Sequence, residues 1–258
     1  MTNEFSGTRV LITAGASGIG AATAKQFLDC GAHVHICDID EAAVSRFLKE
    51  NPTATGSITD VSNEQSVDEL FETVQQELGG LDVLNNNAGI AGPTDPVEGV
   101  SYADWQRCLD VNLGAAFLCA RRAIPMLKEA GGGSIINMSS TAGLFGFPNR
   151  SPYAAAKWAI IGFTKTLAME LGTDNIRANC ICPGSVSGDR MDRVVAAHAI
   201  ATGETEEAIR TSYTSASSMN TFVSPDDIAA SILFLCSKAG NKISGQALPV
   251  DGHAEAIQ

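Results

Sequence analysis

Short apolar runs alternate with amphipathic helical patterns along the 258 residues of the chain. Apolar runs of this length are typical of parallel strands, which are covered on both faces. Seven strands are predicted, at residues 9–13, 33–37, 53–59, 81–84, 134–138, 176–182 and 247–250. The helical patterns between them predict helices over residues 18–30, 40–50, 63–78, 102–130, 152–171 and 224–236. Strands that alternate with helices predict an α/β fold, a doubly wound seven-stranded parallel sheet with helices on both faces, in a single domain over residues 1–258.

Two stretches depart from this rhythm. Pro125 lies inside the long helix over residues 102–130, where its missing amide hydrogen predicts a kink or break. Residues 184–223 are polar, rich in Ser, Thr and Ala, and are expected to be only partly helical. Ligands of doubly wound sheets bind at the carboxyl ends of the strands. The loops after the strands are therefore expected to meet at one edge, with residues from about 185 to 222 closing over a substrate.

Charge and composition narrow the class of protein. The formal net charge is −12 and the isoelectric point is about 4.7, which argues against binding to nucleic acids or anionic membranes. No apolar stretch approaches the ~20 residues of a membrane span, and the first residues lack a signal-peptide pattern, so a soluble cytoplasmic protein is expected. The seven cysteines include no C-x-x-C and are expected to be free thiols. The four histidines show no zinc-ligand spacing, so no metal site is expected.

A glycine-rich stretch, TAGASGIG (residues 13–20), follows the first strand and opens a helix. Its spacing is G-x-x-G-x-G, and Ala14 stands where a first glycine might be expected. A loop in this place offers backbone N–H groups and a helix N-terminus to a pyrophosphate, although an ordinary glycine-rich turn is the alternative. The methyl of Ala14 is tolerable if its φ is negative. Cofactor contacts are expected from Gly15, Ser17, Gly18, Ile19 and Gly20.

Acidic residues end the second and third strands. Asp38 stands 18 residues after Gly20, where a carboxylate can accept hydrogen bonds from the ribose hydroxyls of NAD and repel the 2′-phosphate of NADP. No Arg or Lys occupies the adjacent loop positions, so NAD is predicted over NADP, with a helix N-cap as the alternative role of Asp38. Asp60 and Val61 are expected to reach the adenine, and for Asp60 a cap of the next helix competes evenly.

Three asparagines in succession, residues 85–87, end the fourth strand. Buried amides are costly unless they are hydrogen-bonded, so these side chains are expected to tie neighbouring strand ends together. Asn87, Ala88 and Gly89 are expected to border the cofactor.

Tyr153 and Lys157 are spaced i, i+4 and share one face of a predicted helix. A nearby ammonium stabilises a phenolate and lowers the pKa of Tyr, which makes the Tyr a usable general acid/base. Ser140, at the end of the fifth strand, is expected to orient a substrate oxygen. A lone Y-x-x-x-K is common by chance and is often an exposed helix turn. The presence of Ser140, the glycine loop and Asp38 in the same sequence favours a catalytic role for the pair.

The motifs in this order resemble the short-chain dehydrogenases/reductases of about 250 residues, over nearly the whole chain. The resemblance implies a Rossmann-like fold in which Tyr153 exchanges the proton of the alcohol and Ser140 bonds the reacting oxygen. It implies that Lys157 holds the nicotinamide ribose and tunes Tyr153, while Asn112 bends its helix and supports a proton-relay water. The motifs are TAGASGIG, NNAG (86–89), Asn112 in LDVNLG, Ser140, Tyr153 with Lys157, and Pro183-Gly184.

The same resemblance implies that Pro183, Gly184 and Val186 hold the carboxamide, and that Ser187 replaces a threonine often found there. It also implies a homotetramer with the helices 102–130 and 152–171 at the interface. The catalytic residues are then Asn112, Ser140, Tyr153 and Lys157. The expected cofactor contacts are Gly15, Ser17, Gly18, Ile19, Gly20, Asp38, Asp60, Val61, Asn87, Ala88, Gly89, Tyr153, Lys157, Pro183, Gly184 and Val186.

The expected activity is NAD-dependent oxidation of a secondary alcohol, sugar or hydroxy acid. The alternatives are an NADPH-linked carbonyl reductase of the 3-oxoacyl thioester type and a non-catalytic nucleotide sensor, which the presence of Tyr153 and Lys157 disfavours. Arg190 and Arg193 suggest the hypothesis that one of them binds an anionic substrate group, with salt bridges to nearby acids as the alternative. Apolar pocket walls are expected from Phe145, Phe147 and Tyr213.

Overall fold

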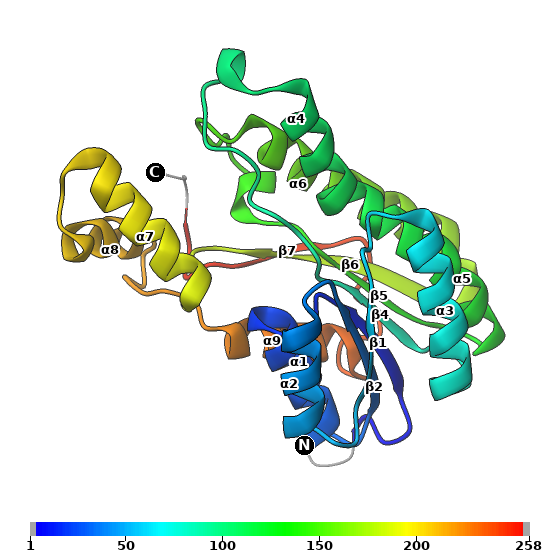
Figure 1. The fold of residues 1–258 in the computed structure, drawn as a ribbon. Helices are drawn as coiled ribbons and strands as arrows, with labels where there is room; N and C mark the ends of the chain where they lie inside the picture. Colours follow the sequence, from blue (N-terminus) through cyan, green and yellow to red (C-terminus); the bar gives the residue numbers. More distant parts are fainter. Residues whose placement is uncertain (1–3, 255–258) are drawn as a thin grey trace.

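The computed structural model describes residues 4–254, apart from the side chains of Arg190, Ala197 and Ala201. Seven parallel strands form one sheet in the order β3-β2-β1-β4-β5-β6-β7 (Figure 1). The order reverses between β1 and β4, which confirms the predicted doubly wound sheet. The strands are β1 (Arg9–Thr13), β2 (His33–Asp38), β3 (Thr55–Ile58), β4 (Val83–Asn86), β5 (Gly133–Met138), β6 (Ile176–Pro183) and β7 (Ala247–Val250).

One face of the sheet is covered by α1 (Gly18–Asp29), α2 (Glu41–Glu50) and α9 (Pro225–Cys236) (Figure 1). Ile12 and Ile136 are fully buried on this side, because alternate residues of a strand point to the same face. The start of the helix predicted over residues 224–236 is confirmed, since Ser224 caps α9 and forms a capping box with Asp227.

The opposite face is covered by α3 (Glu64–Leu78), α5 (Ala115–Glu129) and α6 (Ser151–Leu171). Leu11 and Leu84, each next in sequence to a residue of the first face, are fully buried here. Both faces of the central strands are therefore apolar, which explains why the strands read as continuous hydrophobic runs.

The long helix predicted over residues 102–130 is interrupted, but not at the predicted place. α4 (Tyr102–Leu109) passes into a five-residue π-helical turn over residues 110–114, and α5 then runs on through Pro125. Of the kink or break predicted at Pro125, the break is wrong, because α5 is continuous through this residue. The turns around Pro125 are held by the fully buried Ala123 and Leu127, so packing compensates for the missing backbone hydrogen bond.

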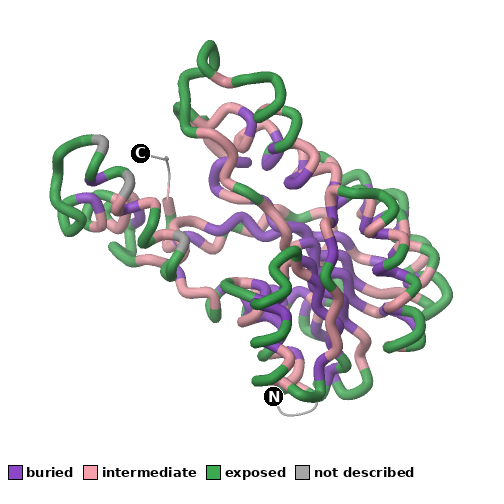
Figure 2. Tube along the Cα trace, viewed as in Figure 1, coloured by how far each residue is buried: buried purple, intermediate pink, exposed green. Residues whose placement is uncertain are grey.

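Residues 189–215, which we call the lid, project from the carboxyl edge of the sheet as α7 (Asp189–Thr202) and α8 (Glu206–Ser215). They confirm the partial helix expected between residues 184 and 223. The lid has a small core of its own, formed by Val195, Ala199 and Ile209. Figure 2 shows the contrast, with buried backbone concentrated in the sheet and mostly exposed or intermediate positions in the lid.

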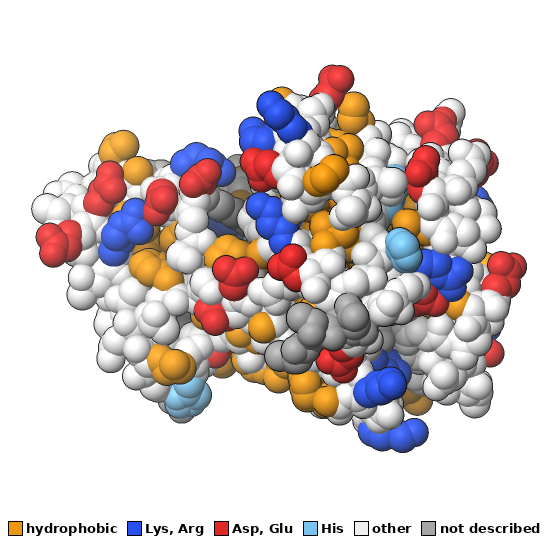
Figure 3. Space-filling view, turned by 90° about the horizontal axis from the view of Figure 1, so that it is seen from below, with side chains coloured by type: hydrophobic (Ala, Val, Ile, Leu, Met, Phe, Trp, Pro, Cys, Tyr) orange, Lys and Arg blue, Asp and Glu red, His pale blue; other side chains and the backbone are white. Residues whose placement is uncertain are grey.

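The described surface carries charges of both signs. On the face in Figure 3, acidic and basic side chains are scattered among each other with apolar areas between them. Within residues 4–254, the longest apolar helical stretch falls short of what a bilayer crossing requires. All seven cysteines are free thiols, five of them buried.

Candidate active site

Two strand-end loops are tied together beside the glycine-rich turn. The Asn87 amide donates from Nδ2 to the main-chain oxygens of Thr13 and Ala14, at 3.0 Å each. Thr13 Oγ1 in turn accepts from the backbone N–H groups of Asn87 and Ala88, also at 3.0 Å. The loops after β1 and β4 therefore form one rigid edge, as expected for Asn87, while Thr13 is a contributor that the motif analysis missed.

Ala14 adopts a left-handed backbone conformation with φ of +48°. The condition under which the methyl would be tolerable, a negative φ, is not met, and the methyl is strained because Cβ approaches the following carbonyl oxygen. The neighbouring glycines are required by space. A Cβ on Gly20 would collide with the Ala14 carbonyl oxygen, and one on Gly15 would lie 2.7 Å from the Ile36 side chain.

The N-terminus of α1 suits an anion. Ser17 occupies the N-cap position without a side-chain capping bond, and the first turn holds no acidic residue. Ser17 and Gly18 are exposed, and Gly18 has a φ of +53°, which glycine adopts without strain. The unused N–H groups and the helix dipole fit the pyrophosphate of a dinucleotide.

Asp38 ends β2 beside this loop. Its carboxylate accepts from the backbone N–H of Ala16 at 3.3 Å and from that of Asp40 at 3.2 Å. The N-cap of α2 is Asp40, whose side chain accepts from Ala43 N at 3.0 Å, so the alternative role of Asp38 as the cap is wrong. The carboxylate lies next to the turn that would hold the cofactor.

Asp60 lies in a turn of its own after β3. One oxygen accepts from the backbone N–H and the hydroxyl of Ser62, at 3.0 and 2.6 Å, and the other lies 3.8 Å from Arg107. The Ser62 hydroxyl bond is the main cause that lowers the pKa of Asp60. The cap of α3 is Asn63, so the cap role considered for Asp60 is wrong. Val61 beside it is buried.

The three asparagines of β4 and its end behave differently. Asn86 donates to Asn137 Oδ1 at 2.9 Å and to the main-chain oxygen of Ala116 at 3.3 Å, as expected for an amide that ties strands together. Asn85 is fully buried, and neither amide atom has a hydrogen-bond partner among the described residues. Its side chain shares the face of Val83, where the core is apolar, so the expectation of a bonded amide fails for Asn85.

Lys157, Asn112 and Gly89 share a small space beside Tyr153. Lys157 is only 4% exposed, its Nζ donates to the main-chain oxygen of Met138 at 2.8 Å, and it lies 5.5 Å from the centre of the Tyr153 ring. A Cβ on Gly89 would lie 2.7 Å from Asn112 Oδ1 and 3.4 Å from Lys157 Nζ. The NNAG motif, Asn112 and the Tyr153–Lys157 pair, which are distant in sequence, therefore lie side by side in the fold.

Asn112 lies in the π-helical turn, where its Nδ2 donates to the main-chain oxygens of Cys108 at 2.9 Å and Ile90 at 3.0 Å. These bonds hold the interrupted helix against the loop after β4, and a local bend at Asn112 is what the family resemblance implied. Asn112 Oδ1 is buried and has no hydrogen-bond partner among the described residues. An acceptor held in this way beside Lys157 suits a bound water.

Ser140 follows β5 and begins a short 3₁₀ turn, Thr141–Gly143, in which its Oγ accepts from Ala142 N at 3.2 Å. Ser139 Oγ donates to the main-chain oxygen of Lys157 at 2.8 Å and fastens the turn to α6. Ser140 is thus held against the helix that bears Tyr153. Ser139 was not singled out from the sequence, although its place at the strand end is the signal.

The end of β6 lies farther along the same edge. Gly184 N donates to the main-chain oxygen of Val250 at 3.1 Å, and a Cβ on Gly184 would lie 2.7 Å from Asp251 Cβ. Val186 pairs with Val223, and the Ser187 hydroxyl donates to the Val223 main-chain oxygen at 3.3 Å. Pro183 and these residues therefore form a close-packed backbone segment at the edge.

An arginine that the motif analysis missed lies beside Tyr153. Arg150 lies 5.6 Å from the centre of the Tyr153 ring and 5.5 Å from that of Phe147. Its only sequence signal is its position three residues before Tyr153. Arg193 is exposed on α7, and the side chain of Arg190 lies outside what the structure describes. The adjacent Asp192 pairs with Arg210 at 2.6 Å.

Comparison with known proteins places this arrangement in a family. A family model described as enoyl-(acyl carrier protein) reductase matches residues 13–253. This chain is a short-chain dehydrogenase/reductase. The matched residues include both the glycine-rich loop and the helix that bears Tyr153. Members of this family are oxidoreductases that act on CH–OH groups, and this protein is one of them.

Relatives of this short-chain dehydrogenase/reductase act on varied substrates. Cis-4-hydroxycyclohexanecarboxylate dehydrogenase of Sinomonas cyclohexanicum is 34% identical over 260 residues, covering 100% of both chains. The 3-oxoacyl-(acyl-carrier-protein) reductase of Chlamydia muridarum is 36% identical over 248 residues, covering 94% of this chain and 95% of the relative. The crystal structure of L-sorbose reductase from Gluconobacter frateurii with NADPH and L-sorbose is 30% identical, with a TM-score of 0.92 and full coverage of both chains.

Proposed function

We propose that this enzyme transfers a hydride between NAD and a secondary alcohol of the sugar, cyclic alcohol or hydroxy acid type, with Tyr153 as general acid/base. The observation that carries the proposal is the position of Tyr153 at the carboxyl edge of the sheet, with Lys157 Nζ 5.5 Å from its ring centre. The buried ammonium favours the phenolate form of Tyr153 and makes proton transfer near neutral pH feasible.

Bound NAD would supply the hydride acceptor. In alcohol oxidation, the Tyr153 phenolate accepts the hydroxyl proton as the carbon–hydrogen bond breaks, and the Ser140 hydroxyl donates to the same oxygen. Lys157 would stabilise the phenolate and hold the ribose hydroxyls. Asn112 Oδ1 would accept from a water that carries the released proton from Lys157 to the solvent, which restores the phenolate. The dinucleotide would be held by Gly15, Ser17, Gly18, Ile19, Gly20, Asp38, Asp60, Val61, Asn87, Ala88, Gly89, Tyr153, Lys157, Pro183, Gly184 and Val186.

The choice of NAD rests on Asp38. Its carboxylate lies against the glycine-rich loop through Ala16 N, where the 2′-phosphate of NADP would meet a negative charge. The sorbose reductase was crystallised with NADPH, so family membership alone does not determine the cofactor. We expect NAD to be preferred about tenfold or more in kcat/KM, and Asp38→Ala to remove that preference chiefly by raising the KM for NAD.

The activity is tested by NADH absorbance with a panel of secondary alcohols, sugars, polyols and hydroxy acids that includes cis-4-hydroxycyclohexanecarboxylate. Tyr153→Phe should lower kcat on the best substrate by about 10²–10⁴-fold, because it removes the acid/base while keeping the ring. NADH binding, followed by fluorescence, serves as the control and should stay unchanged. Turnover by Tyr153→Phe at the rate of the parent enzyme would refute the proposed role.

A second candidate is reduction of a 3-oxoacyl thioester, which the similarity to the Chlamydia muridarum reductase favours. Assays with acetoacetyl-CoA and either NADPH or NADH separate the two candidates. A kcat/KM with acetoacetyl-CoA and NADPH above that of every alcohol with NAD would establish the reductase instead.

The proposal includes a cytoplasmic homotetramer. Phe117 on α5 and Trp158 on α6 are 48% and 53% exposed, and a partner subunit would cover such an apolar surface. Light scattering coupled to gel filtration tests it, and a monomer at micromolar concentration would contradict the tetramer.

A further inference from the structure

Arg150 joins the start of α6 to the loop after β4. It precedes α6 directly, and its guanidinium donates to the main-chain oxygen of Ala91 at 2.9 Å and to Thr94 Oγ1 at 3.0 Å. Both partners belong to the loop after β4. These two bonds fix the guanidinium at the carboxyl edge of the sheet.

The same guanidinium borders the ring of Tyr153. It lies within 5.6 Å of the centres of the Tyr153 and Phe147 rings. Burial raises the pKa of the Tyr213 hydroxyl on α8, and the positive charge of Arg150 opposes that rise. Arg150 therefore lies beside the proposed acid/base, and its charge acts on Tyr213 of the lid.

This placement suits an anion. The chain carries a formal net charge of −12, so a free carboxylate gains nothing from the protein as a whole and needs a local cation. A guanidinium has five N–H donors in a planar fork that matches a carboxylate, and a half-buried, aromatic surrounding strengthens the attraction by excluding water. Arg150 is half-buried among such groups.

We propose that Arg150 binds a carboxylate of the substrate and thereby selects hydroxy acids whose carboxylate lies within a few atoms of the reacting hydroxyl group. This inference rests on the proposed function, because it assigns a substrate class to the same site. The short distance follows from the geometry, since the guanidinium and the phenol ring are 5.6 Å apart.

Arg150 also supports the loop at Ala91 and Thr94, so loss of the side chain has a structural effect that must be separated from anion binding. A structural effect lowers turnover of charged and neutral substrates alike. Loss of an anion contact lowers turnover of the charged substrate alone and acts mainly on KM.

The test compares a hydroxy carboxylate with its carboxamide, which has the same shape and no charge. With the carboxylate most active in the alcohol panel, the parent enzyme should favour the acid over its amide by about tenfold or more in kcat/KM. Arg150→Gln should lower kcat/KM about 10–100-fold on the acid, mainly through KM, and no more than about threefold on the amide. Arg150→Lys, which keeps the charge, should recover part of the loss.

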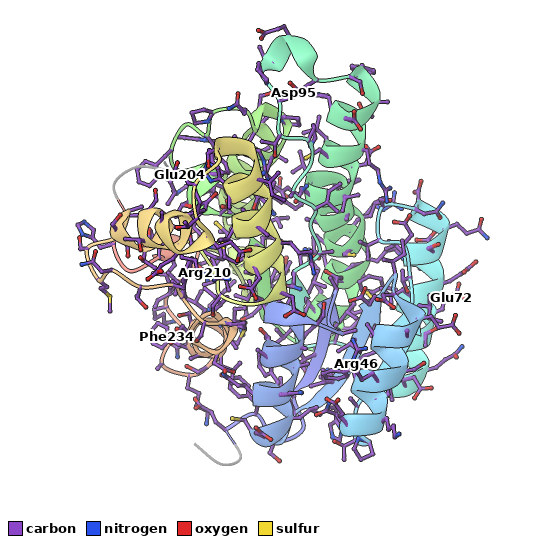
Figure 4. The ribbon with its side chains drawn as sticks, turned by 60° about the vertical axis from the view of Figure 1, so that its left-hand side comes forward. Arg46, Glu72, Asp95, Glu204, Arg210 and Phe234 are labelled. Carbon is purple, nitrogen blue, oxygen red and sulfur yellow. The ribbon has the colours of Figure 1, made fainter. Side chains whose placement is uncertain are left out.

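Two other arginines complete the design. Arg46 is exposed on α2, away from the lid residues Glu204 and Arg210 in Figure 4, so Arg46→Gln removes one positive charge without touching the site. It should leave both substrates unchanged. Arg193→Gln tests the rival arginine on α7, and a loss confined to the acid in this variant, with none in Arg150→Gln, would overturn the proposal.

The remaining outcomes separate this inference from the proposed function. Equal losses on acid and amide in Arg150→Gln, or a parent enzyme that oxidises neutral alcohols without preferring acids, would overturn the role of Arg150 and leave the dehydrogenase proposal intact. Absence of turnover with every alcohol would contradict the proposed function itself.

A measurement on the parent enzyme covers the case in which Arg150→Gln does not fold. Cyclohexanecarboxylate and cyclohexanecarboxamide serve as competitive inhibitors of alcohol oxidation. The acid should bind about tenfold more tightly than the amide, and the difference should shrink as sodium chloride is raised. Equal inhibition by the two compounds would overturn the proposal.

Discussion

The sheet edge and the lid differ in how firmly their parts are held together. At the edge, the loops are locked by side-chain bonds into the backbone, such as those from Asn87 to Thr13 and Ala14. The lid holds itself together by three buried side chains, Val195, Ala199 and Ile209, and its outer faces are largely exposed. The sheet edge packs onto the main hydrophobic core, whereas the lid has a separate, smaller core.

The difference corresponds to two requirements of catalysis, which are accurate positioning of the reacting groups and access for the substrate. Groups that position a cofactor and a proton must be fixed within fractions of an ångström, and residues on rigid strand ends supply that accuracy. A segment that admits the substrate and releases the product must open at a low cost in free energy, which a small core permits. We expect substrate choice to depend on the lid and on Arg150 beside Tyr153.

Matched truncations of two buried isoleucines measure this difference most directly. Ile136→Ala in the main core should lower the free energy of unfolding by about 3–4 kcal/mol, because the cavity lies among packed neighbours. Ile209→Ala in the lid should lower it by less than about 1 kcal/mol, because the lid can open locally, while raising the KM of the alcohol severalfold.

Both tryptophans, Trp105 in α4 and Trp158 in α6, lie outside the lid, so their fluorescence in urea reports on the main body. Hydrogen exchange of α8 reports on the lid. Similar losses of global stability in Ile136→Ala and Ile209→Ala would show that the lid unfolds with the sheet and would remove the distinction.

A buried histidine predicts that the sheet loses stability in acid. His35 is fully buried in β2, between Thr55 Oγ1 at 2.7 Å and Ser57 Oγ at 2.9 Å, and burial lowers its pKa to about 4. Its unfolded pKa is near 6.5, so the unfolded chain binds the proton first as the pH falls. Stability from neutral His35 is complete above about pH 6.5, and about 3 kcal/mol is lost between there and pH 4.

Urea unfolding at pH 7.0 and pH 4.5 checks the expectation. His35→Gln keeps a polar side chain between the two hydroxyls and removes the titration, so its loss of stability over this interval should be smaller by about 2–3 kcal/mol. The same pH dependence in both proteins would assign the acid sensitivity to other groups.

The sequence was most informative where a position admits only one type of residue, for steric or chemical reasons. Glycines that avoid a collision, as at Gly15 and Gly20, and the i, i+4 pair of Tyr153 and Lys157 mark the edge without knowledge of the tertiary structure. The alternation of apolar and helical segments likewise predicted the sheet, because both faces of each central strand must be covered.

It was least informative where the outcome depends on neighbours distant in sequence. Pro125 signals a break in any isolated helix, but the packing of α5 overrides it, and the interruption comes instead where Asn112 bonds the carbonyl groups of Cys108 and Ile90. Arg150 has no motif of its own, since its meaning comes from Ala91 and the two rings around it. The local pattern carries no record of these contacts.

Asn85 is a weakness in the otherwise well-bonded strand β4. Its amide is fully buried without a hydrogen-bond partner among the described residues, which costs free energy that an apolar side chain would not. Asn85→Leu, similar in shape, should stabilise the protein by about 1–2 kcal/mol.

Asn86→Leu is the matched control one residue later. Asn86 donates to Asn137 and Ala116, so removing its amide should destabilise the protein by about 1–3 kcal/mol. If Asn85→Leu instead destabilises the protein, then the amide has a partner such as a buried water, and the edge is bonded more completely than the contacts among side chains show.

The smallest expected effect concerns Ala14, the strained residue of the glycine-rich loop. Its φ of +48° costs an alanine about 1–2 kcal/mol relative to glycine, and the greater flexibility of glycine in the unfolded chain offsets part of that. Ala14→Gly should therefore raise the free energy of unfolding by about 0.5–1 kcal/mol. NAD affinity should change by less than about twofold, because Asn87 holds the Ala14 carbonyl oxygen through a backbone contact that both residues can make.

Gly15→Ala is the opposite change one position later. Its Cβ would lie 2.7 Å from the Ile36 side chain, so it should destabilise the fold and weaken NAD binding together. Thermal unfolding and NAD titration of both variants separate two effects. Ala14→Gly reports on backbone strain, and Gly15→Ala reports on the lack of space for a side chain. A weaker affinity for NAD in Ala14→Gly, despite higher stability, would mean that the strained alanine itself orders the loop for the cofactor, and that the rigid edge owes part of its precision to that strain.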